Sequence, residues 1–228
     1  MSALPFDLQI LNALAALFLL LAFAMLAQRR VVTLVSLLAF QGALLCAATL
    51  LLAYRTGQTH LYVSALLTLA LKVVFLPWLL HRLIRRLDVY WDSDPLLNTT
   101  ATMLLGLLIV IFAFGLAQPI TALASTATRN AIGIAVAVVL LAFLTMITRR
   151  KAMSQVVGFL SMENGLFFAA TSATYGMPMV VELGIALDVL VAMLILGVFF
   201  FQIREQFDSL DLHHLESLKE DAGTGRHE

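Results

Sequence analysis

Residues 8–27 read LQILNALAALFLLLAFAMLA, twenty positions without a charged side chain. Arg29 and Arg30 follow, and residues 31–53 form a second apolar run of the same kind. The hydrocarbon core of a bilayer is about 30 Å thick, so about 20 apolar residues suffice for one helix to cross it. Every backbone polar group at that depth must be hydrogen-bonded within the helix. The stretch therefore predicts two membrane-spanning helices joined by a short basic turn.

The composition of the whole chain is that of a membrane protein. Of its 228 residues, 61% are hydrophobic and 12% are charged, whereas soluble domains contain roughly 45–50% apolar and about 25% charged residues. Apolar runs long enough to cross a bilayer lie at residues 8–27, 31–53, 61–84, 99–117, 130–148, 153–174 and 178–202. We expect an all-α polytopic membrane protein with about seven transmembrane helices.

Lysine and arginine are unevenly divided between the loops of this arrangement. The loops after the first, third and fifth runs hold eight of them, whereas the loops after the second, fourth and sixth runs hold Arg55 and Arg129. Basic residues accumulate in cytoplasmic loops. We therefore expect the N-terminus outside and the C-terminus in the cytoplasm.

Charge and motifs exclude several classes of function. Lysine plus arginine and aspartate plus glutamate number 14 each, and no segment forms a basic stripe, so the expected partner is the lipid bilayer and not a nucleic acid. The phosphate-loop, zinc-protease, serine-hydrolase and paired-cysteine motifs are missing from the sequence. The single Cys46 cannot by itself form an intramolecular disulfide or a metal cage. We expect no catalytic centre, cofactor or metal site in this chain.

Two parts of the chain resemble each other. Arg29-Arg30 corresponds to Arg149-Arg150, residues 41–48 can be laid on residues 164–171, and residues 69–73 match residues 185–189. These matches predict two parallel three-helix repeats joined by one extra span, as in some transporters built from parallel repeats. The predicted domains are a first repeat at 1–90, a linker span at 91–129, a second repeat at 130–204 and a cytoplasmic acidic tail at 205–228.

Three ionisable residues lie near the middle of their runs. Lys72 is about 12 residues into the third run, and Glu163 and Asp188 are each about 10 residues into theirs. At 1.5 Å per residue each lies about 15–18 Å from the edge, which is near the midplane of the bilayer. A charge at that depth costs about 2.5–3.5 kcal/mol or more, so such groups are rare unless they are paired or functional.

Two interpretations of these charges remain open. Removal from water favours the neutral forms of acids and amines alike, which suits proton exchange near neutral pH, so Glu163, Asp188 and Lys72 are candidates for a proton relay. The other interpretation is a buried ion pair that locks helices together. Glu182, close to the outer face, is either a possible proton exit or a snorkelling side chain, and Pro77 should distort the helix beside Lys72.

The stretch Arg149-Arg150-Lys151, then Gly158 to Asn164, then Ile185 to Asp188 resembles the K subunit of respiratory complex I. The similarity covers roughly residues 130–210. It implies that Glu163 and Asp188 occupy the positions of two carboxylates within the membrane, the second of them shortened by one methylene.

The whole chain resembles the component E family of hydrogenase-4, which belongs to energy-converting nickel–iron hydrogenases of the formate hydrogenlyase type. This resemblance implies a non-catalytic subunit of the bacterial inner membrane, placed between antiporter-like subunits and the hydrogenase arm. It also implies that Glu163 and Asp188 pass protons along a lateral hydrated axis. In the first repeat, Gln41 or Phe40 and Lys72 stand where acids would be, which leaves a second proton path in doubt.

Two other functions remain open from the sequence. One is a free-standing transporter of a small solute with the 3-1-3 parallel repeat. The other is a purely structural assembly subunit in which Lys72 pairs with Asp188 or Glu163.

Overall fold

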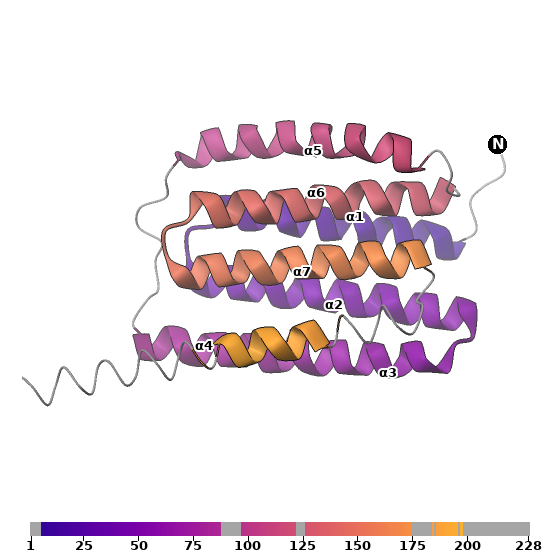
Figure 1. Cartoon of the computed structure of the whole chain (residues 1–228), viewed down its shortest axis with the longest axis horizontal. Helices are drawn as coiled ribbons and strands as arrows, with labels where there is room; N and C mark the ends of the chain where they lie inside the picture. Colours follow the sequence, from indigo (N-terminus) through magenta and orange to yellow (C-terminus); the bar gives the residue numbers. More distant parts are fainter. Residues whose placement is uncertain are drawn as a thin grey trace, which may run out of the picture. The chain divides into compact units, whose positions relative to one another are not determined.

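The computed structural model of the chain describes residues 6–87, 97–121, 126–174, 184, 186–195 and 197. It divides into two compact units, Met1–Ala186 and Leu187–Glu228. The helical bundle belongs to the first unit. Its elements are α1 (Phe6–Ala27), α2 (Val31–Thr56), α3 (Thr59–Thr68), the π-helix η1 (Leu69–Phe75), α4 (Leu76–Leu87), α5 (Thr99–Thr121), α6 (Thr126–Thr148) and α7 (Ala152–Thr174), shown in Figure 1.

Six helical stretches are long and apolar enough to cross a membrane, counting only the described part of the chain. One of them, Thr59–Arg86, joins α3, η1 and most of α4. This confirms the prediction of an all-α polytopic membrane protein. Within the seventh predicted run the structure describes an apolar helix, Ala186–Ile195, which lies almost wholly in the second unit. The rest of that run and the acidic tail lie outside the described residues.

Helix α5 continues beyond the predicted end of its apolar run. The fourth run was expected to end at residue 117, before Gln118 and Pro119, but α5 continues through Pro119 to Thr121. Proline removes one backbone donor and presses its ring against the carbonyl four residues earlier. Pro119 stands in the last turn of α5, where a single hydrogen bond is lost.

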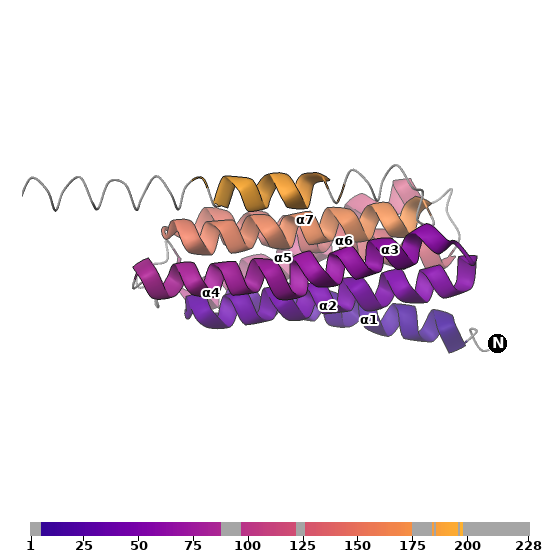
Figure 2. The same cartoon turned by 90° about the horizontal axis from the view of Figure 1, so that it is seen from below.

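The bundle has two rows of helices with α5 on one side. The helices α1 and α2 and the long α3–η1–α4 helix form one row, in which α2 contacts both neighbours. The second row consists of α6 and α7, so that α1 packs on α6 and α2 packs on α7. Helix α5 covers α6 and part of α1 (Figures 1 and 2).

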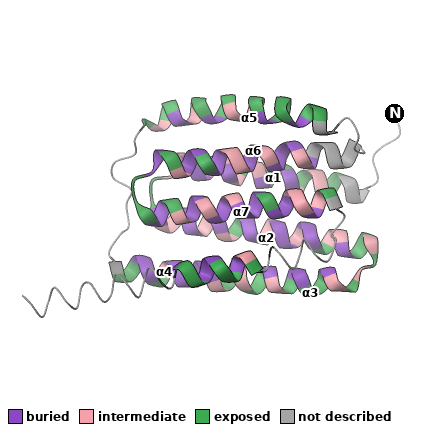
Figure 3. Ribbon diagram, in the orientation of Figure 1, coloured by how far each residue is buried: buried purple, intermediate pink, exposed green. Residues whose placement is uncertain are grey.

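Small residues let the four central helices approach closely. The main core cluster contains alanines from α1, α2 and α6, among them Ala15, Ala48 and Ala135, beside larger side chains. Phe18 of α1 and Phe168 of α7 meet there with ring centroids 5.1 Å apart. Small residues at helix contacts are typical of packing within membranes. The buried side chains gather on facing sides of these helices, whereas α5 is exposed over most of its length (Figure 3).

Gly57 ends α2 and turns the chain into α3. Its φ is +67°, in the left-handed region, and its N–H donates to the carbonyl of Ala53. Replacing Gly57 with alanine is expected to destabilise the protein by about 1 kcal/mol, because a Cβ is strained in this conformation. Unfolding can be followed with a thiol-reactive dye, since the chain's single cysteine, Cys46, is buried.

Gly115 provides the matched control for this substitution. A Cβ at either glycine meets no atom within 4 Å, but Gly115 is helical and carries no positive φ. Gly115→Ala should leave the unfolding temperature unchanged or raise it. Equal effects of the two alanines would show that backbone conformation at Gly57 does not matter.

Arg149 closes the end of α1 from the turn between α6 and α7. Its side chain is buried, and Nη2 donates to the carbonyl oxygens of Leu26 at 3.0 Å, Met25 at 3.5 Å and Gln28. The last carbonyls of a helix have no partner within the helix. A positive group placed there satisfies them and interacts favourably with the helix dipole.

Arg149→Gln is expected to lower the free energy of unfolding by about 2–3 kcal/mol, because hydrogen bonds from a charged donor to buried carbonyls are lost. The neighbouring Arg150 is exposed and supplies the control. Arg150→Gln should change the unfolding temperature measured with the thiol dye by no more than the experimental error. If the two variants unfold alike, the cap does not stabilise the bundle.

Candidate functional site

The third transmembrane helix is irregular at its centre. Residues Leu69–Phe75 form the π-helix η1, in which the N–H of Leu76 donates to the carbonyl of Leu71. Pro77 stands two residues after the π-helix, and a proline ring clashes with the carbonyl four residues before it in a regular α-helix. The wider π turn accommodates this clash, and π-helical segments are frequently found at functional sites. The distortion expected beside Lys72 therefore takes the form of a π-helix.

Lys72 lies in the middle of η1 and points into the bundle. Its side chain is 4% exposed, and that of Glu163 on α7 is 3% exposed. Nζ of Lys72 lies 3.2 Å from Oε1 of Glu163 and donates a hydrogen bond to it. The structure thus brings together two of the three charges that the sequence placed near the midplane.

Two amides extend this ion pair into a network. Nζ of Lys72 also donates to Oδ1 of Asn164 at 2.9 Å, and Nδ2 of Asn164 donates to Oε1 of Gln41 at 3.4 Å. Gln41 comes from α2 and is fully buried, and its Nε2 has no hydrogen-bond partner among the described residues. The site therefore joins α2, η1 and α7 through polar side chains.

Gly42 allows η1 to lie directly against α2. A Cβ at Gly42 would stand 3.2 Å from the Cβ of Lys72 and 3.4 Å from its carbonyl oxygen. At the tip of the lysine side chain, Nζ lies 5.5 Å from the ring centroid of Phe167, within the range of a cation–π interaction. Close backbone packing and an aromatic face thus hold the lysine at one position.

The two other predicted site residues, Asp188 and Glu182, stay predictions. Asp188 belongs to the short apolar helix Ala186–Ile195, in the second unit. Glu182 lies outside the described residues. Asn164 and Gln41 were not predicted as site residues, although the repeat had aligned them with each other, and that alignment was the available signal.

No three histidine, cysteine, aspartate or glutamate side chains in the described part of the chain gather in a way that could hold a metal ion. The chemistry open to the described site is that of an ammonium, a carboxylate and two amides in a buried setting. Such groups can exchange protons or hold a charge, and amides can orient both partners.

Two named proteins show what the chain is related to. It is 39% identical over 187 residues to uncharacterized protein Rv0085 of Mycobacterium tuberculosis, a match that covers 82% of this chain and 85% of that protein. It is 26% identical over 148 residues to hydrogenase-4 component E of Escherichia coli strain K12, covering 65% of this chain and 68% of that protein. No family model matches the chain, and no solved structure gives a significant match.

The second relative agrees with the resemblance noted from the sequence, while the similarity to the K subunit of complex I stays a prediction. The chain belongs to the family of the mycobacterial protein Rv0085, and it is a distant homologue of hydrogenase-4 component E.

Proposed function

We propose that the chain is a non-catalytic membrane subunit of an energy-converting nickel–iron hydrogenase complex of the hydrogenase-4 or formate hydrogenlyase type. In this proposal Lys72 and Glu163 take part in moving protons, and the partners are antiporter-like subunits and the hydrogenase arm. The observation that carries it is the buried ion pair between Lys72, on a π-helix, and Glu163, on α7, in a homologue of hydrogenase-4 component E.

The energetics of buried ion pairs favour a role for Lys72 and Glu163 in proton movement over a purely stabilising one. Replacing a buried ion pair by apolar residues of similar volume is often neutral or stabilising, so stability alone is a weak reason to keep one. The distance of 3.2 Å between Nζ and Oε1 lies within reach of direct proton transfer. Oδ1 of Asn164 can accept a hydrogen bond from Nζ of Lys72 whichever member of the pair holds the proton.

Buried hydroxyl groups lie on both sides of the pair along the helices. Ser64 stands eight residues before Lys72, and Ser154 nine residues before Glu163, about 12–14 Å away in each case. The two helices run in opposite directions, so these serines lie toward opposite ends of the bundle (Figure 1). Both hydroxyls are buried without a hydrogen-bond partner among the described residues. Ordered water commonly satisfies such groups and would extend a proton path from the pair.

The structural-subunit hypothesis is the second candidate, because the observed ion pair is also what a helix lock requires. The two candidates differ in what a neutral isostere does. A lock predicts weaker assembly for Glu163→Gln, whereas a proton site predicts an assembled complex with impaired proton movement.

Purification from the native membrane tests membership of the complex. The tagged chain is extracted in a gentle detergent and the associated proteins are identified by mass spectrometry, with an unrelated tagged membrane protein as control. We expect antiporter-like subunits and a nickel–iron hydrogenase to co-purify with the chain and not with the control. A chain that emerges alone, or as a homo-oligomer, would contradict the proposal and favour a free-standing transporter.

A further inference from the structure

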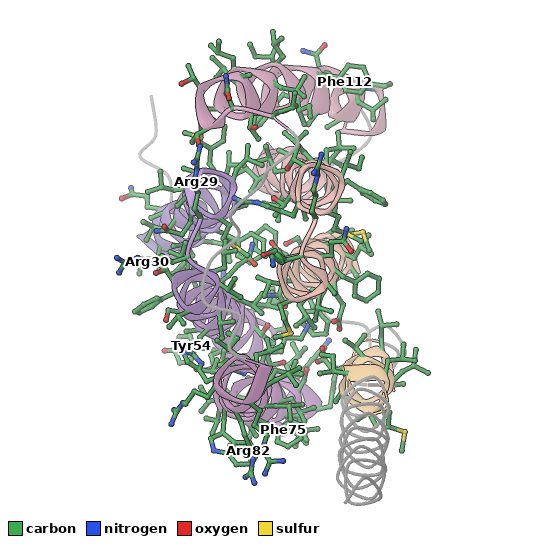
Figure 4. The ribbon with its side chains drawn as sticks, turned by 90° about the vertical axis from the view of Figure 1, so that its left-hand side faces the viewer. Arg29, Arg30, Tyr54, Phe75, Arg82 and Phe112 are labelled. Atoms are coloured by element: carbon green, nitrogen blue, oxygen red, sulfur yellow. The ribbon has the colours of Figure 1, made fainter. Side chains whose placement is uncertain are left out.

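The exposed face of α4 carries a basic cluster that the proposed function does not use. Trp78, Arg82, Arg85 and Arg86 line an open cavity of about 330 Å³. The opposite face of the same helix is buried in the bundle through Leu79, Leu80, Leu83 and Ile84. Figure 4 looks along the bundle from this end and shows Arg82 on its outside, away from Arg29 and Arg30.

The geometry of the cluster suits a phosphate group. The guanidinium carbon of Arg82 lies 5.4 Å from the ring centroid of Trp78, which fixes the side chain by a cation–π contact. Arginine presents a planar fork of donors that matches phosphate oxygens in pairs. Arginine side chains around one cavity therefore suit a phosphate group.

The depth of the cluster places it at the membrane surface. The continuous helix Thr59–Arg86 has 28 residues and is about 42 Å long, which exceeds the hydrocarbon core of about 30 Å. The last turns of the helix therefore reach the layer of lipid headgroups. Trp78 stands one turn inside them, where aromatic rings prefer to lie.

An exposed apolar strip leads away from the cluster toward the centre of the bilayer. Leu66, Val74 and Trp78 are exposed, as is Ala70 between them, and these residues follow one another at intervals of four on the same helix face. A strip from residue 66 to residue 78 is about 18 Å long, which is the dimension of a lipid acyl chain. A soluble acidic partner would not contact this apolar strip. A lipid can contact both the strip, through its acyl chain, and the basic cluster, through its headgroup.

We propose that the Trp78–Arg82–Arg85–Arg86 cluster binds the phosphate headgroup of an anionic phospholipid whose acyl chain lies along the strip. Basic pockets at the ends of transmembrane helices are a recognised mode of binding such lipids. The bound headgroup would occupy the cavity at the edge of the bundle. Lipid binding at this cluster does not require that the chain belong to a hydrogenase complex.

Quenching of Trp78 by brominated lipids tests the proposal. The chain has two tryptophans, so Trp91→Phe leaves Trp78 as the only one. The full chain is placed in nanodiscs of phosphatidylcholine and phosphatidylglycerol at one fixed ratio, and bromine is carried on the acyl chains of either lipid in turn. We expect the anionic lipid to be enriched beside Trp78 by at least about fivefold, the gain from one arginine near a lipid phosphate.

Variants distinguish a specific lipid site at this cluster from nonspecific attraction of anionic lipid to the positive charge at this end of the bundle. Arg82→Gln, Arg85→Gln and Arg86→Gln together should abolish the enrichment. A control that neutralises three exposed cations at the same end of the bundle, Arg30→Gln, Arg150→Gln and Lys151→Gln, should preserve it. The thiol dye on Cys46 verifies that each variant is folded. If the triple variant does not fold, Arg85→Gln alone replaces it and should give an intermediate enrichment of the anionic lipid.

Three results would overturn the proposal. The first is equal quenching by the two brominated lipids in the starting protein, and the second is an equal loss of enrichment in both triple variants. The third is a loss of enrichment on adding soluble glycerol phosphate, which would identify a phosphate site that does not need the lipid.

Discussion

Lys72→Met is expected to lower the free energy of unfolding by about 3–5 kcal/mol, the cost of removing one partner from a buried ion pair. The carboxylate of Glu163 would lose the ammonium that lies 3.2 Å away, and Asn164 would lose its donor at 2.9 Å. Methionine keeps an unbranched apolar stem as far as Cε and lacks only the terminal ammonium, so the change removes the charge and its hydrogen bonds with little loss of packing. With the thiol dye, the unfolding temperature should fall by roughly 10 °C.

The double variant Lys72→Met with Glu163→Gln provides the control for this prediction. If the loss arises from an uncompensated charge, neutralising Glu163 as well should restore much of the stability, with a coupling energy of about 2–3 kcal/mol. Strictly additive effects of the two substitutions would show that the pair is not energetically coupled.

Glu163→Gln is expected to reduce proton translocation per hydrogenase turnover by at least about tenfold, because an amide cannot accept and release a proton as a carboxyl group does. Glutamine has the size of glutamate and can still accept the hydrogen bond from Lys72, so the complex should assemble. The measurement compares acidification or alkalinisation of membrane vesicles with hydrogen production or consumption in the same sample.

Glu163→Asp is the matched variant, since it keeps the carboxyl group and shifts it by one methylene. It should recover a substantial part of the translocation that Glu163→Gln loses. Unchanged coupling in a well-assembled Glu163→Gln complex would remove Glu163 from the proton path. Loss of the complex itself would favour the structural role.

The ion pair could be anticipated from the positions of Lys72 and Glu163 in the sequence. Lys72 and Glu163 each lie near the middle of a long apolar run, and helical rise alone puts them at one depth. That they meet depends on η1 and α7 both packing on α2. Such a choice of neighbours depends on side-chain packing throughout the bundle and cannot be obtained from the periodicity of single segments.

The π-helix could not be predicted from the sequence, for a different reason. Pro77 indicates that the preceding hydrogen bonds must change, but a kink, a lost bond or a π turn would each satisfy it. Gly42 favours one of these conformations over the others, because its missing Cβ lets the backbone at Lys72 approach α2. Similarly, Pro119 was overestimated as a helix breaker because its position in the last turn of α5 makes it tolerable.

The contact between Gln41 and Asn164 bears on the proposed repeat. The alignment of residues 41–48 with 164–171 equates these two amides, and their side chains meet at 3.4 Å between α2 and α7. Equivalent residues face each other in this way across a two-fold axis. The repeat and the domain boundaries derived from it stay predictions, because most of the last run lies outside the described residues.

The central claim is that Glu163 changes its protonation state while the complex works. Infrared difference spectroscopy compares the assembled complex at rest with the same complex during turnover. A change in protonation appears in the carbonyl band of the protonated carboxylic acid. We predict a band in the unmodified complex that shifts in Glu163→Asp and disappears in Glu163→Gln. A difference spectrum that is the same in all three would contradict the account and leave the Lys72–Glu163 pair as a structural link between helices.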